Sequence, residues 1–349
     1  MPSPIPVLDL APYFRGEAGA HPALAAEISR ASETVGFTFV VGHGVPWDLV
    51  ERTFEAAAQF HAQPIEAKRA FAIDEHNIGY MGFGASVTRS SAVNANTRPN
   101  LNEAVFFKRE RAPGDPKVIA NKRFCGMNRW PDLPGFRATV IDYCAALETL
   151  ARRLVPVYAA SLDLPEGFFD AAFAEPQFTL RMSHYPSVAA HGDNEFGSAP
   201  HTDSSFITLL AQSPVAGLEI RARDGAWLAA PVIPRSILVN SGDMMRRWTN
   251  HRYLSTPHRV RNVSGLDRYA IPFFFDAGMD YPIGCLPTCQ SPDNPARYPP
   301  TTYAEYMTWF ARKNYDHQRE REGDPGAAPG TASPTSPGDD VRAAATGER

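Results

Sequence analysis

The chain has 349 residues, of which 44% are hydrophobic and 21% are charged, so it can bury a sizeable core. Its 34 basic and 38 acidic side chains give a formal net charge of −4, which argues against a basic nucleic-acid-binding surface. No apolar run reaches the roughly 18 residues of a membrane-spanning helix, and the first ten residues lack the charged and apolar regions of a secretory signal.

The first half of the chain is predicted to be rich in helices. Apolar residues recur three and four positions apart before the middle of the chain, which is typical of an amphipathic helix. Another helix is predicted after Pro46, because the fixed φ of proline suits a first helical position. The predicted elements are a strand at 6–10, a helix at 22–35, a strand at 36–42 and helices at 46–62 and 135–162.

From residue 178 onward, short strand patterns alternate with turn residues such as Asp224-Gly225 and Ser264-Gly265. Regularly spaced short strands of this kind predict an antiparallel sandwich or barrel. The predicted strands lie at 178–185, 206–212, 218–222, 226–229, 236–240, 258–263 and 269–275, and a last helix is predicted at 302–314.

The cysteines and the C-terminal residues lead to two further predictions. Four cysteines are too few for a disulfide framework, so we expect free thiols in a cytoplasmic protein. Residues 323–349 are rich in proline, glycine, alanine and hydroxyl side chains, with Val341 the only large apolar residue. This composition predicts a disordered tail. The cysteines are Cys125, Cys144, Cys285 and Cys289.

Candidate metal ligands occur in a strand-like segment that begins at His201 and in the strand predicted at 258–263. His201 and Asp203 stand at i and i+2, so on a strand they would project from the same face and could chelate one ion. His258 begins another predicted strand 55 positions after Asp203 and could supply a third ligand. Two histidines and one carboxylate are the ligand set of non-haem Fe(II) oxygenases. Arg268 lies ten positions further on, and its guanidinium could bind a carboxylate of a small acid that also chelates the metal.

Together with other motifs, these residues resemble the isopenicillin N synthase-like family of Fe(II)/2-oxoglutarate-dependent dioxygenases. The resemblance covers residues 5–311. Its motifs include Ile5-Pro6-Val7-Leu8-Asp9-Leu10, Gly42-His43-Gly44-Val45, Asn128-Arg129-Trp130-Pro131, Arg181-Met182-Ser183-His184-Tyr185-Pro186, His201-Thr202-Asp203, Val239-Asn240-Ser241-Gly242-Asp243 and Ser255-Thr256-Pro257-His258-Arg259-Val260.

The resemblance implies a mainly β fold, with a double-stranded β-helix (jelly-roll) core and flanking α-helices. It implies one oxygenase domain at 1–322, with a helix-rich part at 1–170, the jelly-roll core at about 171–285 and a C-terminal helix at 302–314. By the same resemblance, the site residues would be His201, Asp203 and His258 as Fe(II) ligands, with Arg268 and Tyr185 binding 2-oxoglutarate.

The implied activity is oxidation of a small organic substrate by O2, with release of succinate and CO2. Hydroxylation, desaturation and ring formation are all open as outcomes. Two alternatives also stay open: a 2-oxoglutarate-independent iron oxidase of the same family, and a catalytically inactive jelly-roll binding protein. Neither nucleic acid nor membrane is expected as a partner, and the sequence does not indicate an oligomeric state.

The chain departs from the family pattern at two places near the co-substrate residues. The family has Arg-x-Ser where this chain has Arg268 and Ala270, and it has Asn-Tyr where this chain has Ser183 and His184. Positions 268 and 270 share one strand face, so a hydroxyl is missing from the pocket. Loss of one neutral hydrogen bond, worth about 0.5–1.5 kcal/mol, predicts a several-fold weaker affinity for the co-substrate.

The substrate is predicted to contact the segments at 78–107 and 187–199. Arg98 is predicted to hold a polar or acidic substrate, and Asn100 and Phe106 are further candidates. Arg98→Ala should then change the KM for the substrate.

Three other histidines are interpreted as structural. His43 lies in a Gly-His-Gly turn, and His251 is assigned to a loop. His184 precedes Tyr185 and should therefore face the opposite side of its strand.

Overall fold

The structure is a computed structural model that describes residues 5–326 and 329. Its helices are α1 (Ala11–Phe14), α2 (Ala20–Thr34), α3 (Trp47–His61), α4 (Ile65–Arg69), α5 (Pro116–Ile119), α6 (Phe136–Ser161), α7 (Asp243–Trp248), the 3-10 turn η1 (Pro287–Cys289), α8 (Tyr303–Asn314) and α9 (Asp316–Glu322). Its strands are β1 (Val7–Asp9), β2 (Phe37–Val41), β3 (Gly79–Met81), β4 (Glu103–Lys108), β5 (Gln177–Tyr185), β6 (Ser198–His201), β7 (Ile207–Gln212), β8 (Leu218–Arg221), β9 (Trp227–Ala229), β10 (Ile237–Ser241), β11 (His258–Val260), β12 (Arg268–Asp276), β13 (Pro282–Ile283) and β14 (Thr301–Thr302).

Two facing sheets form the centre of the fold. The main sheet has eight strands in the order β1-β2-β10-β7-β12-β5-β4-β3, and the minor sheet has four in the order β6-β11-β8-β9. Phe39 and Leu238 of the main sheet belong to one buried cluster with Ile220 and Val260 of the minor sheet. Apart from the parallel β1–β2 pair, both sheets are antiparallel, and the interior between them is the jelly-roll core that was predicted.

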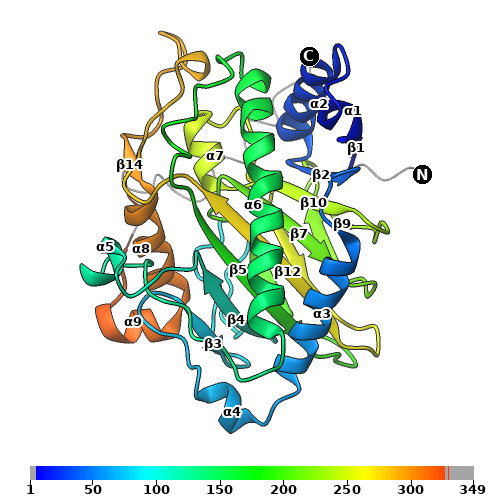
Figure 1. Ribbon diagram of the computed structural model, residues 1–349, viewed down its shortest axis with the longest axis vertical. Helices are drawn as coiled ribbons and strands as arrows, with labels where there is room; N and C mark the ends of the chain where they lie inside the picture. The colour runs from blue at the N-terminus through cyan, green and yellow to red at the C-terminus, as the bar shows by residue number, and fades with distance from the viewer. Residues whose placement is uncertain (1–4, 327–328, 330–349) are drawn as a thin grey trace.

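The other face of the main sheet is covered by helices (Figure 1). The long helix α6 crosses this face, with α3 beside it, and the figure shows both in front of β5, β7 and β12. Leu147 and Leu154 of α6 pack with Leu209 and Phe273 of the sheet in the largest buried cluster. Alternating residues of each central strand therefore face either the helices or the minor sheet.

The strand pairing at the centre of the main sheet determines which of the candidate site residues lie opposite each other. β12 pairs antiparallel with β5, so that Arg268 lies opposite Tyr185, Tyr269 opposite His184 and Ala270 opposite Ser183. On the other side of β5, Glu103 of β4 lies opposite His184. A one-residue shift would exchange the two faces, so this register decides which side chains meet.

The strands predicted from residue 178 onward are confirmed, each to within a few residues, and so are the long helix and the helix near 302–314. Strands β3 and β4 were not predicted, although they extend the main sheet. The part of the chain considered helix-rich therefore also contributes strands to the core.

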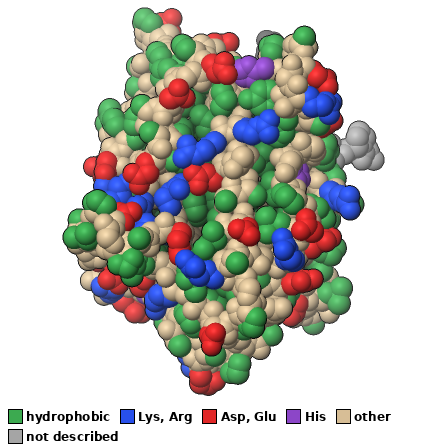
Figure 2. All heavy atoms as spheres, in the orientation of Figure 1, with side chains coloured by type: hydrophobic (Ala, Val, Ile, Leu, Met, Phe, Trp, Pro, Cys, Tyr) green, Lys and Arg blue, Asp and Glu red, His purple; other side chains and the backbone are tan. Residues whose placement is uncertain are grey.

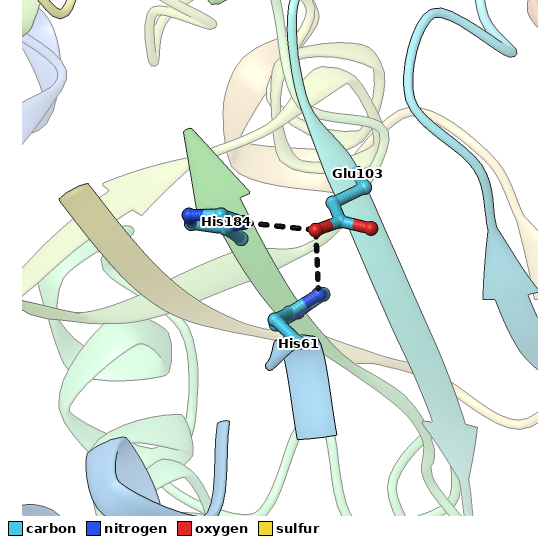
Figure 3. A group of neighbouring side chains, drawn as sticks. All are labelled: His61, Glu103 and His184. Atoms are coloured by element: carbon cyan, nitrogen blue, oxygen red, sulfur yellow. Dashed lines mark hydrogen bonds and ion pairs between the residues drawn. The ribbon is translucent and has the colours of Figure 1, made fainter. Parts of the chain in front are cut away.

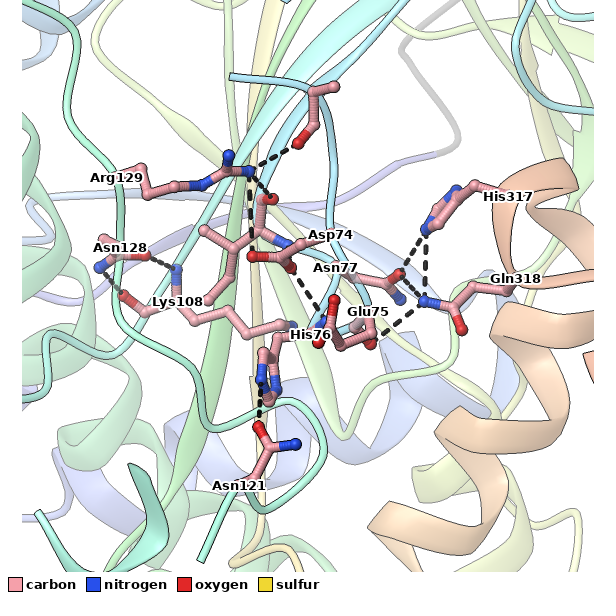
Figure 4. A network of polar contacts seen from close by, with 12 residues as sticks. Asp74, Glu75, His76, Asn77, Lys108, Asn121, Asn128, Arg129, His317 and Gln318 are labelled. Carbon is pink, nitrogen blue, oxygen red and sulfur yellow. Dashed lines mark hydrogen bonds and ion pairs between the residues drawn. The ribbon is translucent and has the colours of Figure 1, made fainter. Parts of the chain in front are cut away.

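The last helices are fixed to the body of the protein by a polar network (Figure 4). The side chain of Gln318 donates to Asn77 Oδ1 and to the Glu75 carbonyl, at 3.0 and 3.1 Å, and His317 contacts the same Asn77 oxygen. This network joins α9 to the loop before β3. Lys313 pairs with Asp324, so the first residues after α9 contact α8. The rest of the predicted tail, residues 327–328 and 330–349, lies outside the described residues.

Two further expectations concern cysteines and membranes. All four cysteines are free thiols, and three of them are buried. Within residues 5–326, no helix is both long enough and apolar enough to span a bilayer.

Candidate active site

The candidate metal ligands meet between the two sheets. His201 is the last residue of β6, and His258 is the first residue of β11, which is its partner strand, so the two histidines lie opposite each other. Asp203 follows in the loop between β6 and β7. The prediction that His201 and Asp203 share one strand is therefore wrong in detail. The strand ends at His201, and the loop brings the carboxylate to the same point.

Each histidine presents its Nε2 atom to Asp203. His201 Nε2 and His258 Nε2 lie 3.9 and 3.6 Å from Asp203 Oδ1, and the ligand atoms all lie within 4.8 Å of one another. The Nδ1 atoms lie 2.8 Å from the Ala199 carbonyl and 3.2 Å from the Thr256 carbonyl. A carbonyl only accepts, so Nδ1 carries the hydrogen and Nε2 keeps its lone pair for a metal.

The Asp203 carboxylate is oriented by two donors. Thr208 Oγ1 and Asn240 Nδ2 both donate to Asp203 Oδ2 at 2.7 Å. The other oxygen, Oδ1, is left facing the two Nε2 atoms. Burial and, to a smaller extent, the neighbouring His258 together lower the pKa of His201 to about 3, so His201 is neutral as a ligand must be. Three lone pairs thus converge at one point, which is the donor set expected for Fe(II).

Arg268 lines the same pocket, and no carboxylate among the described residues pairs with its charge. Its side chain is completely buried, and Nε, Nη1 and Nη2 make no hydrogen bond within the described structure. Burial lowers its pKa below the usual value, which reflects the cost of an unpaired cation. The guanidinium lies 5.2 Å from the ring centre of Tyr185. A buried unpaired arginine beside a metal-ligand triad fits a small acid that binds both.

The missing hydroxyl at Ala270 has a counterpart on the opposite strand. Ser183 lies directly across from Ala270 and shares a face of β5 with Tyr185, which lines the pocket. The Ser183 hydroxyl is buried and makes no hydrogen bond with the residues described. The two departures from the family pattern are therefore one pair of facing residues. A hydroxyl is absent from one strand and present on its neighbour.

A second arginine, Arg181, also lines the pocket. Its Nη2 donates to Asn102 Oδ1 at 2.8 Å, whereas its buried Nε makes no hydrogen bond within the described structure. Its guanidinium lies 5.4 Å from the ring centre of Phe106. Arg181 appeared in the sequence analysis only as part of a motif. Its position two residues before Ser183 and four before Tyr185 was the available signal, because all three share one strand face.

The three predicted substrate residues lie near this pocket but do not line it. Arg98 is half-exposed and pairs with Glu195. Asn100 is buried, and its Oδ1 accepts from the Ala199 amide at 2.8 Å, so it supports β6 just before His201. Phe106 reaches the pocket only through its contact with Arg181. Their roles in substrate binding stay predictions.

The three histidines interpreted as structural each contact other protein groups. His43 accepts from the Val45 amide at 3.1 Å, and its Nε2 lies 3.2 Å from the Arg235 carbonyl. His251 contacts the Tyr298 hydroxyl at 2.6 Å. His184 faces the helices, opposite to Tyr185, and contacts Glu103. Sequence reasoning missed the supporting roles of Thr208 and Asn240, because neither residue type is distinctive on a strand.

Comparison with known proteins agrees with this geometry. Residues 5–133 match the N-terminal region described as non-haem dioxygenase in morphine synthesis, and residues 176–277 match the 2OG-Fe(II) oxygenase superfamily. A 2-oxoglutarate-Fe(II) type oxidoreductase, hxnY, of Emericella nidulans is 35% identical over 90% of this chain and 91% of its own.

Solved structures show the same fold. A 2OG-Fe(II) oxygenase family protein of Caulobacter crescentus has a TM-score of 0.76 and 28% identity, covering 92% of this chain and 99% of its own. JOX2, solved in complex with 2OG, Fe and JA, has a TM-score of 0.72 and 27% identity, covering 88% of this chain and 84% of its own. The chain therefore belongs to the Fe(II)/2-oxoglutarate-dependent oxygenase superfamily. It is an oxidoreductase of the dioxygenase class within that superfamily.

Proposed function

We propose that His201, Asp203 and His258 hold Fe(II), and that Arg268 and Tyr185 bind the distal carboxylate of 2-oxoglutarate. The observation that carries this assignment is the completely buried, unpaired guanidinium of Arg268 in the pocket of the triad. When bound, Fe(II) and 2-oxoglutarate supply O2 activation and the electrons for it, with release of succinate and CO2. Arg268 and Tyr185 would hold the distal end of the acid, and the three metal ligands would hold the ion that binds its other end.

The co-substrate assignment is tested by succinate formation and by binding. Wild-type protein should form succinate and bind 2-oxoglutarate in anaerobic calorimetry with Fe(II). Arg268→Lys should raise the Kd for 2-oxoglutarate by more than about tenfold, because an ammonium group does not reproduce the bidentate hydrogen bonds of a guanidinium with a carboxylate. Turnover without succinate would instead support the 2-oxoglutarate-independent oxidase. Absence of both metal and 2-oxoglutarate binding would support the inactive binding protein.

The substrate is proposed to be a small molecule with a carboxylate or carbonyl oxygen that accepts a hydrogen bond from Arg181. The unpaired Nε of Arg181 in the pocket supports this class.

Nucleic acid is not proposed as a substrate, because basic and acidic side chains are intermixed on the face shown in Figure 2 and the net charge is −4. The reducing cytoplasm is the proposed location, supported by the four free thiols.

Arg181 and Arg98 provide a matched comparison for substrate binding. A succinate-detecting screen of small acids, amides and ketones should first identify a substrate. Arg181→Gln should then raise its KM by about tenfold or more, because a buried donor to a polarised oxygen is lost. Arg98→Ala tests the sequence-based prediction, and an unchanged KM would remove Arg98 from the site. An unchanged KM in Arg181→Gln would contradict the proposed substrate class.

A further inference from the structure

A second histidine–carboxylate–histidine cluster lies on the opposite face of the main sheet (Figure 3). His61 of α3 and His184 of β5 both point toward the carboxylate of Glu103 on β4. The ligand-type atoms of these three residues lie within 4.8 Å of one another, as they do in the triad between the sheets. The hydrogen-bond partners of each atom decide whether this cluster holds a metal ion or a proton.

His184 lies between two carboxylates. Its Nδ1 is 2.9 Å from Glu103 Oε1, and its Nε2 is 2.9 Å from Asp267 Oδ2. Burial lowers the pKa of His184, but the hydrogen bonds with Glu103 and Asp267 outweigh it and raise the pKa above the ordinary value of 6.5. Because ionised carboxylates only accept hydrogen bonds, both contacts are satisfied at once only when both ring nitrogens carry a hydrogen. The geometry thus favours the imidazolium form.

Glu103 receives more donors on its other oxygen. Lys68 Nζ and the Tyr80 hydroxyl lie 2.8 and 2.5 Å from Glu103 Oε2. Burial raises the pKa of Glu103, but the hydrogen bonds from His184, Lys68 and Tyr80 hold it far below its usual range. With Asp267, the cluster has two negative groups and two positive groups, Lys68 and protonated His184. Charge balance leaves no demand for a metal cation.

His61 stays neutral in this cluster. Burial lowers its pKa, and its Nε2 donates to the Met182 carbonyl at 3.0 Å. Its Nδ1 lies 3.4 Å from Glu103 Oε1. The remaining neighbour of His184 is Tyr269 of β12, whose ring stacks on the imidazole with 4.9 Å between ring centres. The groups that face His184 are therefore Glu103 from β4, Asp267 before β12, His61 from α3 and Tyr269, with Lys68 and Tyr80 acting through Glu103.

The cluster lies on the opposite face of the main sheet from the proposed co-substrate residues, next to them in the chain. His184 precedes Tyr185, and Asp267 precedes Arg268, which is the register partner of Tyr185. The His184–Asp267 contact therefore joins the end of β5 to the start of β12. Among the described residues, the guanidinium of Arg268 makes no hydrogen bond, so its place in the pocket depends on the backbone that this contact holds.

We propose that protonated His184 is a positioning residue, which fixes Arg268 and Tyr185 for the distal carboxylate of 2-oxoglutarate and weakens that binding when it loses its proton. This inference rests on the proposed function. Both hydrogen bonds of His184 are present below pH 6.5, and one of the two, together with the positive charge, is lost as the pH rises through the raised pKa of His184. The affinity for 2-oxoglutarate should therefore fall with rising pH.

The test is anaerobic calorimetry of 2-oxoglutarate binding to the Fe(II)-loaded protein between pH 6 and 9. In wild-type protein the Kd should rise about fivefold across this range, as expected for one partly exposed charge-assisted contact. His184→Gln should show the high-pH Kd throughout, and Asp267→Asn should reduce the pH dependence. Asp280→Asn is the matched control, because Asp280 is an exposed carboxylate paired with Lys122, and it should keep the wild-type curve.

Pyruvate is the second probe, because it keeps the 2-oxo acid group but lacks the distal carboxylate. Its affinity should be the same in His184→Gln and wild-type protein at each pH. Equal weakening for pyruvate, or the same 2-oxoglutarate curve in both proteins, would overturn the positioning role. A second bound metal per chain that is lost in His61→Ala would overturn the assignment of a proton to this cluster. Failure of wild-type protein to bind 2-oxoglutarate at any pH would instead contradict the proposed function.

Discussion

Two histidine–carboxylate–histidine clusters lie on opposite faces of one sheet, and they are suited to different cations. In the pocket cluster, backbone carbonyls fix both Nδ1 atoms and two neutral donors cap one oxygen of Asp203, so three lone pairs converge. In the helix-side cluster, Lys68 and Tyr80 cap Glu103, and His184 donates to carboxylates from both nitrogens. The residue types alone therefore do not define a metal site. The neighbouring donors decide whether the cluster takes a metal ion or a proton.

The strongest test of this difference removes one carboxylate from each cluster and measures bound iron. Asp203→Ala should weaken Fe(II) binding by more than about 100-fold, because it removes a direct ligand. Glu103→Gln should leave bound iron at the wild-type level, measured by metal analysis after gel filtration. Equal loss of iron in both variants would show that the two clusters are not chemically distinct.

The reverse result is expected for stability. Glu103→Gln leaves Lys68 and His184 buried without their shared counter-charge, so unfolding should require about 3–5 kcal/mol less free energy. Urea denaturation of the metal-free protein measures this difference. Glu33→Gln is the control, because Glu33 forms a partly exposed pair with Arg252 that should contribute about 0–1 kcal/mol. A similar loss in both variants would mean that the Glu103 cluster is no more important than a surface ion pair.

The sequence predicted the pocket cluster better than the helix-side cluster for a physical reason. His201 and Asp203 are close in the chain, so their spacing alone brings them together, although a loop and not a strand does so. His61, Glu103 and His184 come from a helix and two strands, and only the packing of α3 on β4 and β5 joins them. A buried glutamate has no recognisable sequence pattern, because the partners that make its burial tolerable are distant in the chain.

The same reasoning applies to the strands and to the arginines. β5 and β12 were predicted because turn residues bound their apolar patterns, whereas β4 was missed because both of its faces are buried. The sequence analysis predicted Arg98 as a substrate residue, whereas Arg181 appeared only as part of a motif. The structure distinguishes their surroundings, because Glu195 pairs with Arg98 while Arg181 keeps an unpaired nitrogen in the pocket.

A smaller effect should follow from removing a donor that orients the metal-ligating carboxylate. Thr208→Val keeps the shape of the side chain but deletes the hydrogen bond to Asp203 Oδ2, so Fe(II) affinity should fall about tenfold. Competition with a chelator measures this affinity. Thr53→Val removes a hydroxyl that bonds only within α3 and should leave the affinity unchanged. An unchanged affinity in Thr208→Val would show that the carboxylate does not need this donor.

The smallest expected effect concerns the hydroxyl that faces Ala270. If Ser183 supplies the hydrogen bond that the family obtains from position 270, Ser183→Ala should raise the 2-oxoglutarate Kd several-fold, consistent with about 0.5–1.5 kcal/mol for one neutral bond. Adding Ala270→Ser to that variant should restore the affinity, because the two positions are register partners across β5 and β12. Ser236→Ala removes a hydroxyl that bonds to the Ile233 carbonyl and should have no effect. If the double variant binds no better than Ser183→Ala, the two positions do not exchange this contact, and the Arg268 pairing alone accounts for binding of the distal carboxylate.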